Sequence, residues 1–114
     1  MTRQTGLIVT LTALVFVAVT VATLMPARLE HLVPGNDKLY HFLAFGALVL
    51  PTAAVRPRWA IWAVLATIAY GGFIEIIQPY FGRERELADL RADALGAMAA
   101  AVAGLVLNRF WLRR

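Results

Sequence analysis

The side chains that could do chemistry in this chain of 114 residues gather in two stretches of the sequence. They are Asp37, Lys38 and His41 in the first stretch, and Glu75, Gln78, Arg83, Arg85, Asp89 and Asp93 in the second. Carboxylates and an imidazole can bind a polar ligand, hold an ion such as zinc, or exchange protons as acid and base. The chain contains no serine and no cysteine, which argues against covalent catalysis and excludes disulfides.

The composition places these polar residues in a membrane protein. Hydrophobic residues make up 61% of the chain and the mean hydropathy is +0.69, whereas ordinary soluble domains are roughly 45–50% apolar. A domain of this size buries too little surface to hide so many apolar side chains from water. We therefore expect the lipid bilayer to be its main partner and solvent.

Four apolar segments are long enough to cross that bilayer, because about 20 helical residues at ~1.5 Å each span a ~30 Å hydrocarbon core. A signal peptide is the competing interpretation of the first segment, but its apolar run exceeds the 7–15 residues that such peptides use, so we favour an uncleaved helix. Within the second segment, Pro51 is expected to kink the helix. The sequence predicts an all-α, four-helix integral membrane bundle, a single domain over residues 1–114. The predicted spans are residues 6–25, 37–55, 59–78 and 90–107.

The charges predict an orientation. Four spans place both termini and the turn at residues 56–58 on one side, with six arginines and no acidic residue. The other side carries five basic residues and the acidic ones. Because short basic segments favour the cytoplasm, we expect both termini to be cytoplasmic. The net charge of +4 is then explained by contact with anionic lipid, and no nucleic-acid partner is expected.

With this topology, polar stripes on three helices should converge at the outer face. Residues three or four positions apart share a face of a helix, as do Asp37 and His41, Glu75 and Gln78, and Asp89 and Asp93. The last stripe continues through small residues at four-residue spacing, which favour close helix packing in membranes. These predicted packing residues are Gly96, Ala100 and Gly104. We expect a polar pocket that opens outward, with Arg83 or Arg85 reaching over it.

These residues also resemble a known family. The pattern Asp37-Lys38-x-x-His41-Phe42-x-x-Phe45-x-x-Leu48 resembles the first signature of the VanZ-like membrane proteins. Glu75-x-x-Gln78, Gly82-Arg83, Asp89 and Gly96 resemble the second. The likeness covers roughly residues 34–107, and Asp93 stands where the family usually has asparagine. The resemblance implies a small bacterial membrane protein of several spans. The family is named after a protein associated with resistance to the glycopeptide teicoplanin, and its biochemical activity is not established.

Three kinds of function fit this pattern. We favour binding of a lipid-linked or peptidoglycan-related headgroup, or of a lipophilic glycopeptide, without a cofactor or a metal. Arg83 or Arg85 and Lys38 would meet anionic groups, while His41, Glu75 and Gln78 would give specificity. One alternative is a hydrolase or transferase that uses His41 and Glu75 as acid and base, or a metal held by His41, Glu75 and Asp93. Another is a structural subunit of a membrane complex, in which the polar residues only hold the helices together.

Overall fold

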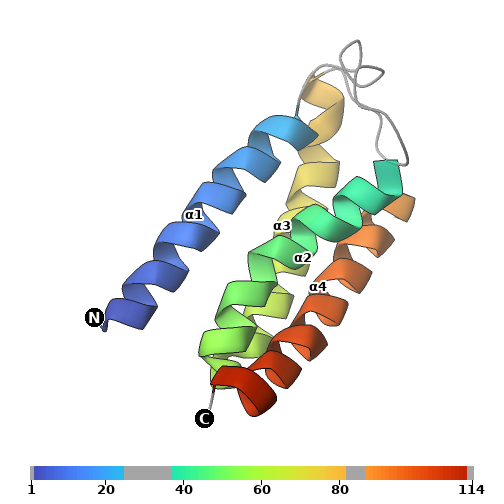
Figure 1. Cartoon of the computed structure of the whole chain (residues 1–114). Coiled ribbons are helices and arrows are strands. Elements are labelled where there is room, and N and C mark those ends of the chain that lie inside the picture. Colours follow the sequence, from blue (N-terminus) through green and yellow to red (C-terminus); the bar gives the residue numbers. More distant parts are fainter. Residues whose placement is uncertain (1, 25–36, 82–86, 113–114) are drawn as a thin grey trace.

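The computed structural model describes residues 2–24, 37–81 and 87–112, which form four long helices (Figure 1). These are α1 (Arg3–Thr23), α2 (Asp37–Val55), α3 (Ala60–Ile77) and α4 (Leu87–Leu107). Short 3₁₀ turns occupy Pro57–Trp59 and Gln78–Phe81, and a π-helical turn occupies Asn108–Leu112. All four helices are long and apolar enough to cross a membrane. The predicted all-α, four-helix membrane bundle is therefore confirmed.

Local chemistry explains where the helices begin and end. The helix α1 begins at Arg3, before the first apolar residue, because the Thr2 side chain accepts a hydrogen bond from the Thr5 amide at 3.1 Å and so caps the first turn. The helix α4 begins at Leu87 rather than Leu90, which places Asp89 in its first turn, where the helix dipole favours a negative charge. Pro51 lies inside α2, which continues to Val55 as predicted, and the kink expected at Pro51 stays a prediction.

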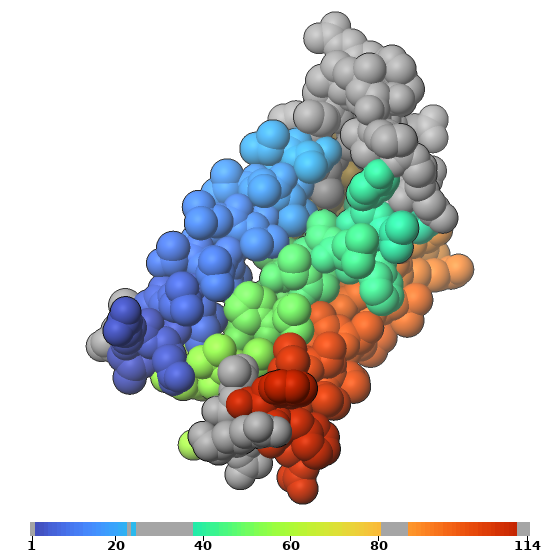
Figure 2. Space-filling model, in the orientation of Figure 1, coloured from blue at the N-terminus to red at the C-terminus, as the bar shows by residue number. Residues whose placement is uncertain are grey.

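The most extensive contact in the bundle lies between α2 and α4, which pack closely side by side (Figure 2). Glycines allow this approach. A Cβ atom built on Gly96 would lie 2.1 Å from the Phe42 carbonyl oxygen, and one on Gly104 would lie 2.5 Å from the Cβ of Ala53. The Cβ of Ala100 would lie 3.5 Å from a Cβ built on Gly46. The three small residues of α4 thus face α2 at backbone contact distance.

The helix α1 packs mainly against α2 and is joined to the bundle near both of its ends. Near its start, the Arg56 guanidinium donates hydrogen bonds to the hydroxyls of Thr2 and Thr5 at 2.8 and 3.1 Å. Near its end, the hydroxyls of Thr20 and Tyr70 are hydrogen-bonded to each other. Few side chains of α1 are buried, Ile8 and Val19 among them, so most of its apolar surface is left for lipid.

The acidic residues of the described ranges all lie in one half of the bundle, together with Lys38 and Arg91, whereas the charged residues of the other half are all arginines. The start of α1 and the end of α4 lie at the same end (Figure 1), and Asn108 ties α4 to α2 there by donating to the Ala54 carbonyl at 2.7 Å. The described arginines of this end are Arg3, Arg56, Arg58 and Arg109. The described carboxylates of Glu75, Asp89 and Asp93 belong to the opposite half, where α3 ends and α4 begins. We call these the basic end and the acidic end.

Candidate functional site

Six of the nine predicted site residues have described side chains. Gln78, Asp93, Asp89, His41 and Glu75 are buried, with exposed fractions between 0 and 5%, and Lys38 is partly exposed. We call these six residues the polar cluster. Arg83, Arg85 and the side chain of Asp37 lie outside the described residues, so the parts predicted for them remain predictions.

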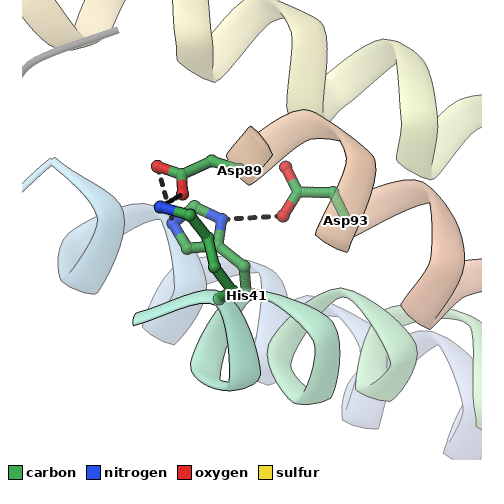
Figure 3. Close-up of polar contacts among 4 residues, drawn as sticks. His41, Asp89 and Asp93 are labelled. Atoms are coloured by element: carbon green, nitrogen blue, oxygen red, sulfur yellow. Dashed lines mark hydrogen bonds and ion pairs between the residues drawn. The ribbon is translucent and has the colours of Figure 1, made fainter. Parts of the chain in front are cut away.

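The centre of the cluster is His41, which lies between two aspartates of α4 (Figure 3). Its Nδ1 atom lies 2.7 Å from Oδ1 of Asp93, and its Nε2 atom lies 3.5 Å from Oδ2 of Asp89. The two aspartates are four residues apart and therefore present their carboxylates on the same face of α4. An imidazole that carries both protons satisfies this arrangement, because each ring nitrogen then points a donor at a carboxylate.

Lys38 extends the cluster toward the helix ends. Its Nζ atom lies 2.6 Å from Oδ1 of Asp89, and its side chain is 37% exposed, whereas that of Asp89 is 3% exposed. The Asp89 carboxylate therefore bridges a partly exposed ammonium and the buried His41 ring. The ammonium group of Lys38 is therefore paired with a buried carboxylate of the protein itself.

On the α3 side of the cluster, a glycine leaves space for one of the carboxylates. A Cβ atom built on Gly71 would lie 2.8 Å from Oδ2 of Asp93, so any other residue at this position would require the carboxylate to shift. Glu75 and Gln78 lie four and seven residues further along the same face of α3, and both are buried. The three polar stripes predicted from the sequence thus belong to helix faces that are turned into the bundle.

An aromatic layer separates the cluster from the middle of the bundle. The His41 ring stacks on Phe45, with centroids 5.9 Å apart and planes inclined by 2°. Phe45 in turn contacts Tyr70 at a centroid distance of 5.7 Å. Phe45 is completely buried. The layer therefore closes the cluster on its apolar side and holds the imidazole in one orientation.

Sequence reasoning missed two members of this site. Gly71 is absent from the predicted site residues, although it lies one turn before Glu75 on the same face of α3. That spacing was the available signal. Tyr70 was missed entirely, because a single tyrosine among apolar residues carries no pattern that distinguishes a hydrogen-bonded residue from a lipid-facing one.

The donor set of the cluster suits hydrogen bonding and charge pairing. Its described side chains comprise three carboxyl groups, one amine and one imidazole, so the acidic groups outnumber the basic ones. No group of three or more histidine, cysteine, aspartate or glutamate side chains in the described ranges is arranged to hold a metal ion. The geometry therefore gives no support to the zinc site considered for His41, Glu75 and Asp93.

Comparison with known proteins agrees with the motifs. A family model described as VanZ/LLP1 matches residues 4–108, which adds the first helix to the region covered by the two signatures. Neither the curated proteins nor the solved structures include a match to this chain. The matched region contains α1 to α4 and the whole polar cluster. The chain is therefore an integral membrane protein that belongs to the VanZ/LLP1 family.

Proposed function

We propose that the polar cluster is a binding site for the polar headgroup of a cell-envelope ligand, either a lipid-linked precursor or a lipophilic glycopeptide. The observation that carries the proposal is the imidazole of His41 between the carboxylates of Asp89 and Asp93 inside a membrane bundle. Ionisable residues inside membranes are costly and generally serve a function. The burial of four ionisable side chains in one small bundle therefore indicates that they serve a function beyond packing.

Helix packing alone does not explain why these ionisable residues are buried. One interhelical hydrogen bond in a membrane contributes only about 0.6–2 kcal/mol, and α2 and α4 are already in backbone contact at Gly96. The contact at Gly96 holds these two helices together without charged groups. We infer that the additional buried carboxylates are kept because they meet a ligand.

The charges of the cluster favour a particular chemistry in that ligand. Lys38 is paired with Asp89, and carboxylates outnumber the described cationic groups of the cluster. Amino and hydroxyl groups, which donate hydrogen bonds, fit this environment better than phosphate alone. Glycopeptides and peptidoglycan precursors carry such donors. Arg83 and Arg85 stay in the proposal as the groups that would meet a phosphate.

The pairing of His41 and Asp93 also supports a second candidate, an acid/base hydrolase or transferase. A carboxylate 2.7 Å from one ring nitrogen orients an imidazole for proton transfer at the other nitrogen. Here, however, the second nitrogen faces Asp89 at 3.5 Å. A substrate would have to displace that carboxylate before His41 could exchange a proton with it. Binding therefore remains the preferred function.

Glu75→Gln tests the binding proposal, because it removes a charge while it keeps the size of the side chain. Loss of a charged hydrogen-bond partner weakens a ligand by about 1.5–3 kcal/mol, which is about 10- to 100-fold in Kd. We expect this loss when purified protein in lipid nanodiscs is titrated with teicoplanin and with a lipid-linked peptidoglycan precursor. At least one of these ligands should bind the unchanged protein, and that ligand should leave without chemical change.

The matched control for this experiment is Asn108→Ala. It removes a hydrogen bond between the end of α4 and α2 at the basic end. It therefore costs the bundle one polar contact, as Glu75→Gln can, without changing the polar cluster. We expect the control to bind like the unchanged protein. Equal binding by both variants, or no binding of either ligand by the unchanged protein, contradicts the proposal. Release of a cleaved or transferred product supports the enzyme instead.

We further propose that the basic end faces the cytoplasm of a bacterial cell and that the acidic end faces the envelope. The arginine-rich end of the bundle supports this orientation. A reporter enzyme that is active only in the cytoplasm, fused after Arg114, should be active, and the same reporter inserted in the segment 25–36 should be inactive. The reverse pattern contradicts the orientation.

A further inference from the structure

A groove separates α1 from α3 in the half of the bundle that leads to the basic end. Its volume is about 440 Å³, which is within the range of ligand sites, and α1, α2 and α3 contribute to its walls. The lining residues that matter below are Thr12, Phe16, Thr52, Trp59, Ala66 and Tyr70. The groove is distinct from the polar cluster, from which the layer of Phe45 and Tyr70 separates it.

The groove exists because α1 is held at its ends rather than along its length. Arg56 binds the first turn of α1, and Tyr70 binds Thr20 near the last turn. Between these points α1 rests on α2, whereas α3 packs more extensively against α4 than against α2. The space between α1 and α3 is therefore not filled by protein.

The length of the groove corresponds to one leaflet of the membrane. Its α3 wall runs from Trp59 to Tyr70, which are eleven residues apart. At ~1.5 Å per residue this distance is about 16 Å, about half of a ~30 Å hydrocarbon core. An acyl chain of one lipid from the leaflet at the basic end has the matching length and polarity.

The basic end supplies the charge that such a lipid would need. Arg58 is exposed and directly precedes Trp59, which lines the groove, and Arg56 lies at the junction of α1 and α2. No acidic side chain of the described ranges belongs to this half of the bundle. Basic pockets between membrane helices select anionic headgroups. Trp59 and Trp62, which line the groove and are 46% and 69% exposed, suit the depth at which aromatic residues meet headgroups.

We propose that this groove is a binding site for an anionic phospholipid, with one acyl chain between α1 and α3 and the headgroup at Arg58. The acyl chain gains no hydrophobic energy by leaving the bilayer, because lipid tails are as apolar as the groove. The chain therefore fills the groove whichever lipid supplies it, and the headgroup charge decides which lipid is retained. The site is independent of the ligand proposed for the polar cluster.

Fluorescence quenching by brominated lipids tests this site, because two of the three tryptophans of the chain line the groove. In a Trp111→Phe background, Trp59 and Trp62 are the remaining reporters. The protein is reconstituted in phosphatidylcholine vesicles with increasing fractions of either dibromo-phosphatidylglycerol or dibromo-phosphatidylcholine. One arginine near a membrane surface contributes about 1 kcal/mol to anionic lipid binding, so half-maximal quenching by the glycerol lipid is expected at about a fivefold lower fraction.

Three variants define the site further. Arg58→Gln should remove the preference for the anionic lipid and leave quenching by phosphatidylcholine unchanged. Ala66→Phe should fill the groove and abolish the preference, whereas Ala103→Phe, which adds the same side chain to an exposed site on α4, should not. Thr12→Val removes a buried hydroxyl that has no hydrogen-bond partner in the described part of the chain. Thr12→Val should leave the preference for the anionic lipid unchanged, because an acyl chain offers no hydrogen-bond partner to the hydroxyl.

Other results overturn the proposal. Equal half-maximal fractions for the two brominated lipids show that the groove does not select an anionic lipid. A preference that survives both Arg58→Gln and Ala66→Phe shows that the selective site lies elsewhere. A preference that Thr12→Val abolishes shows that the occupant carries a polar group in the middle of the membrane and is not an acyl chain.

Discussion

Gly96→Ala is expected to destabilise the bundle by about 3 kcal/mol, at the upper end of the 1–3 kcal/mol that overpacking usually costs. The added Cβ would lie 2.1 Å from the carbonyl oxygen of Phe42 and 2.8 Å from the carbonyl carbon of the same residue. Both are backbone atoms, so no side chain can rotate to make room. Helices α2 and α4 must move apart, and this weakens the most extensive contact among the described helices. The measurement is reversible unfolding in mixed micelles, followed by tryptophan fluorescence.

Gly72→Ala is the matched control for this substitution. A Cβ built on Gly72 meets nothing within 4 Å, so the change only replaces glycine by the best helix-forming residue. It should stabilise the protein by up to about 1 kcal/mol. If both alanine variants were equally stable, the close approach at Gly96 would not control the association of α2 with α4.

The sequence predicts this packing only in part. The spacing of Gly96, Ala100 and Gly104 marks one face of the helix as small, and the structure places that face against α2. The partner was not predictable, because any of three helices could fill a groove of small residues. The distance was not predictable either, since it depends on the crossing geometry of two whole helices. Gly46 of α2 adjoins Gly96, but its role in packing can be recognised only when α2 is known to be the partner of α4.

The polar cluster shows the same limit. Helical spacing predicts that His41, Glu75 and Asp93 turn toward the interior, and all three are buried. It does not predict which of them touch, because successive residues of a helix point about 100° apart and a small rotation changes the partner. The sequence suggested His41 and Glu75 as an acid/base pair. In the structure, the side chains found at the two ring nitrogens are Asp93 and Asp89.

The second large effect is expected from His41→Leu, which removes one charged partner of a completely buried carboxylate. Asp93 has no exposed surface and lies 2.7 Å from the imidazole. Breaking a buried ion pair from one side usually costs about 3–5 kcal/mol, because an uncompensated charge stays behind. We expect His41→Leu to lower the free energy of unfolding by this amount. Asp93→Asn should cost only about 1 kcal/mol, since the amide oxygen still accepts a hydrogen bond from His41.

The double variant His41→Leu with Asp93→Leu separates stability from function. Replacing both members of a buried pair by apolar residues of similar size is often neutral or stabilising, so much of the stability lost in His41→Leu should return. Unfolding of the two single variants and the double variant gives the coupling energy of the pair. If the cluster only holds helices together, a stable double variant should keep every function of the protein. If it binds a polar headgroup, the same variant should fold normally and lose the ligand, because both groups that specify the site have gone.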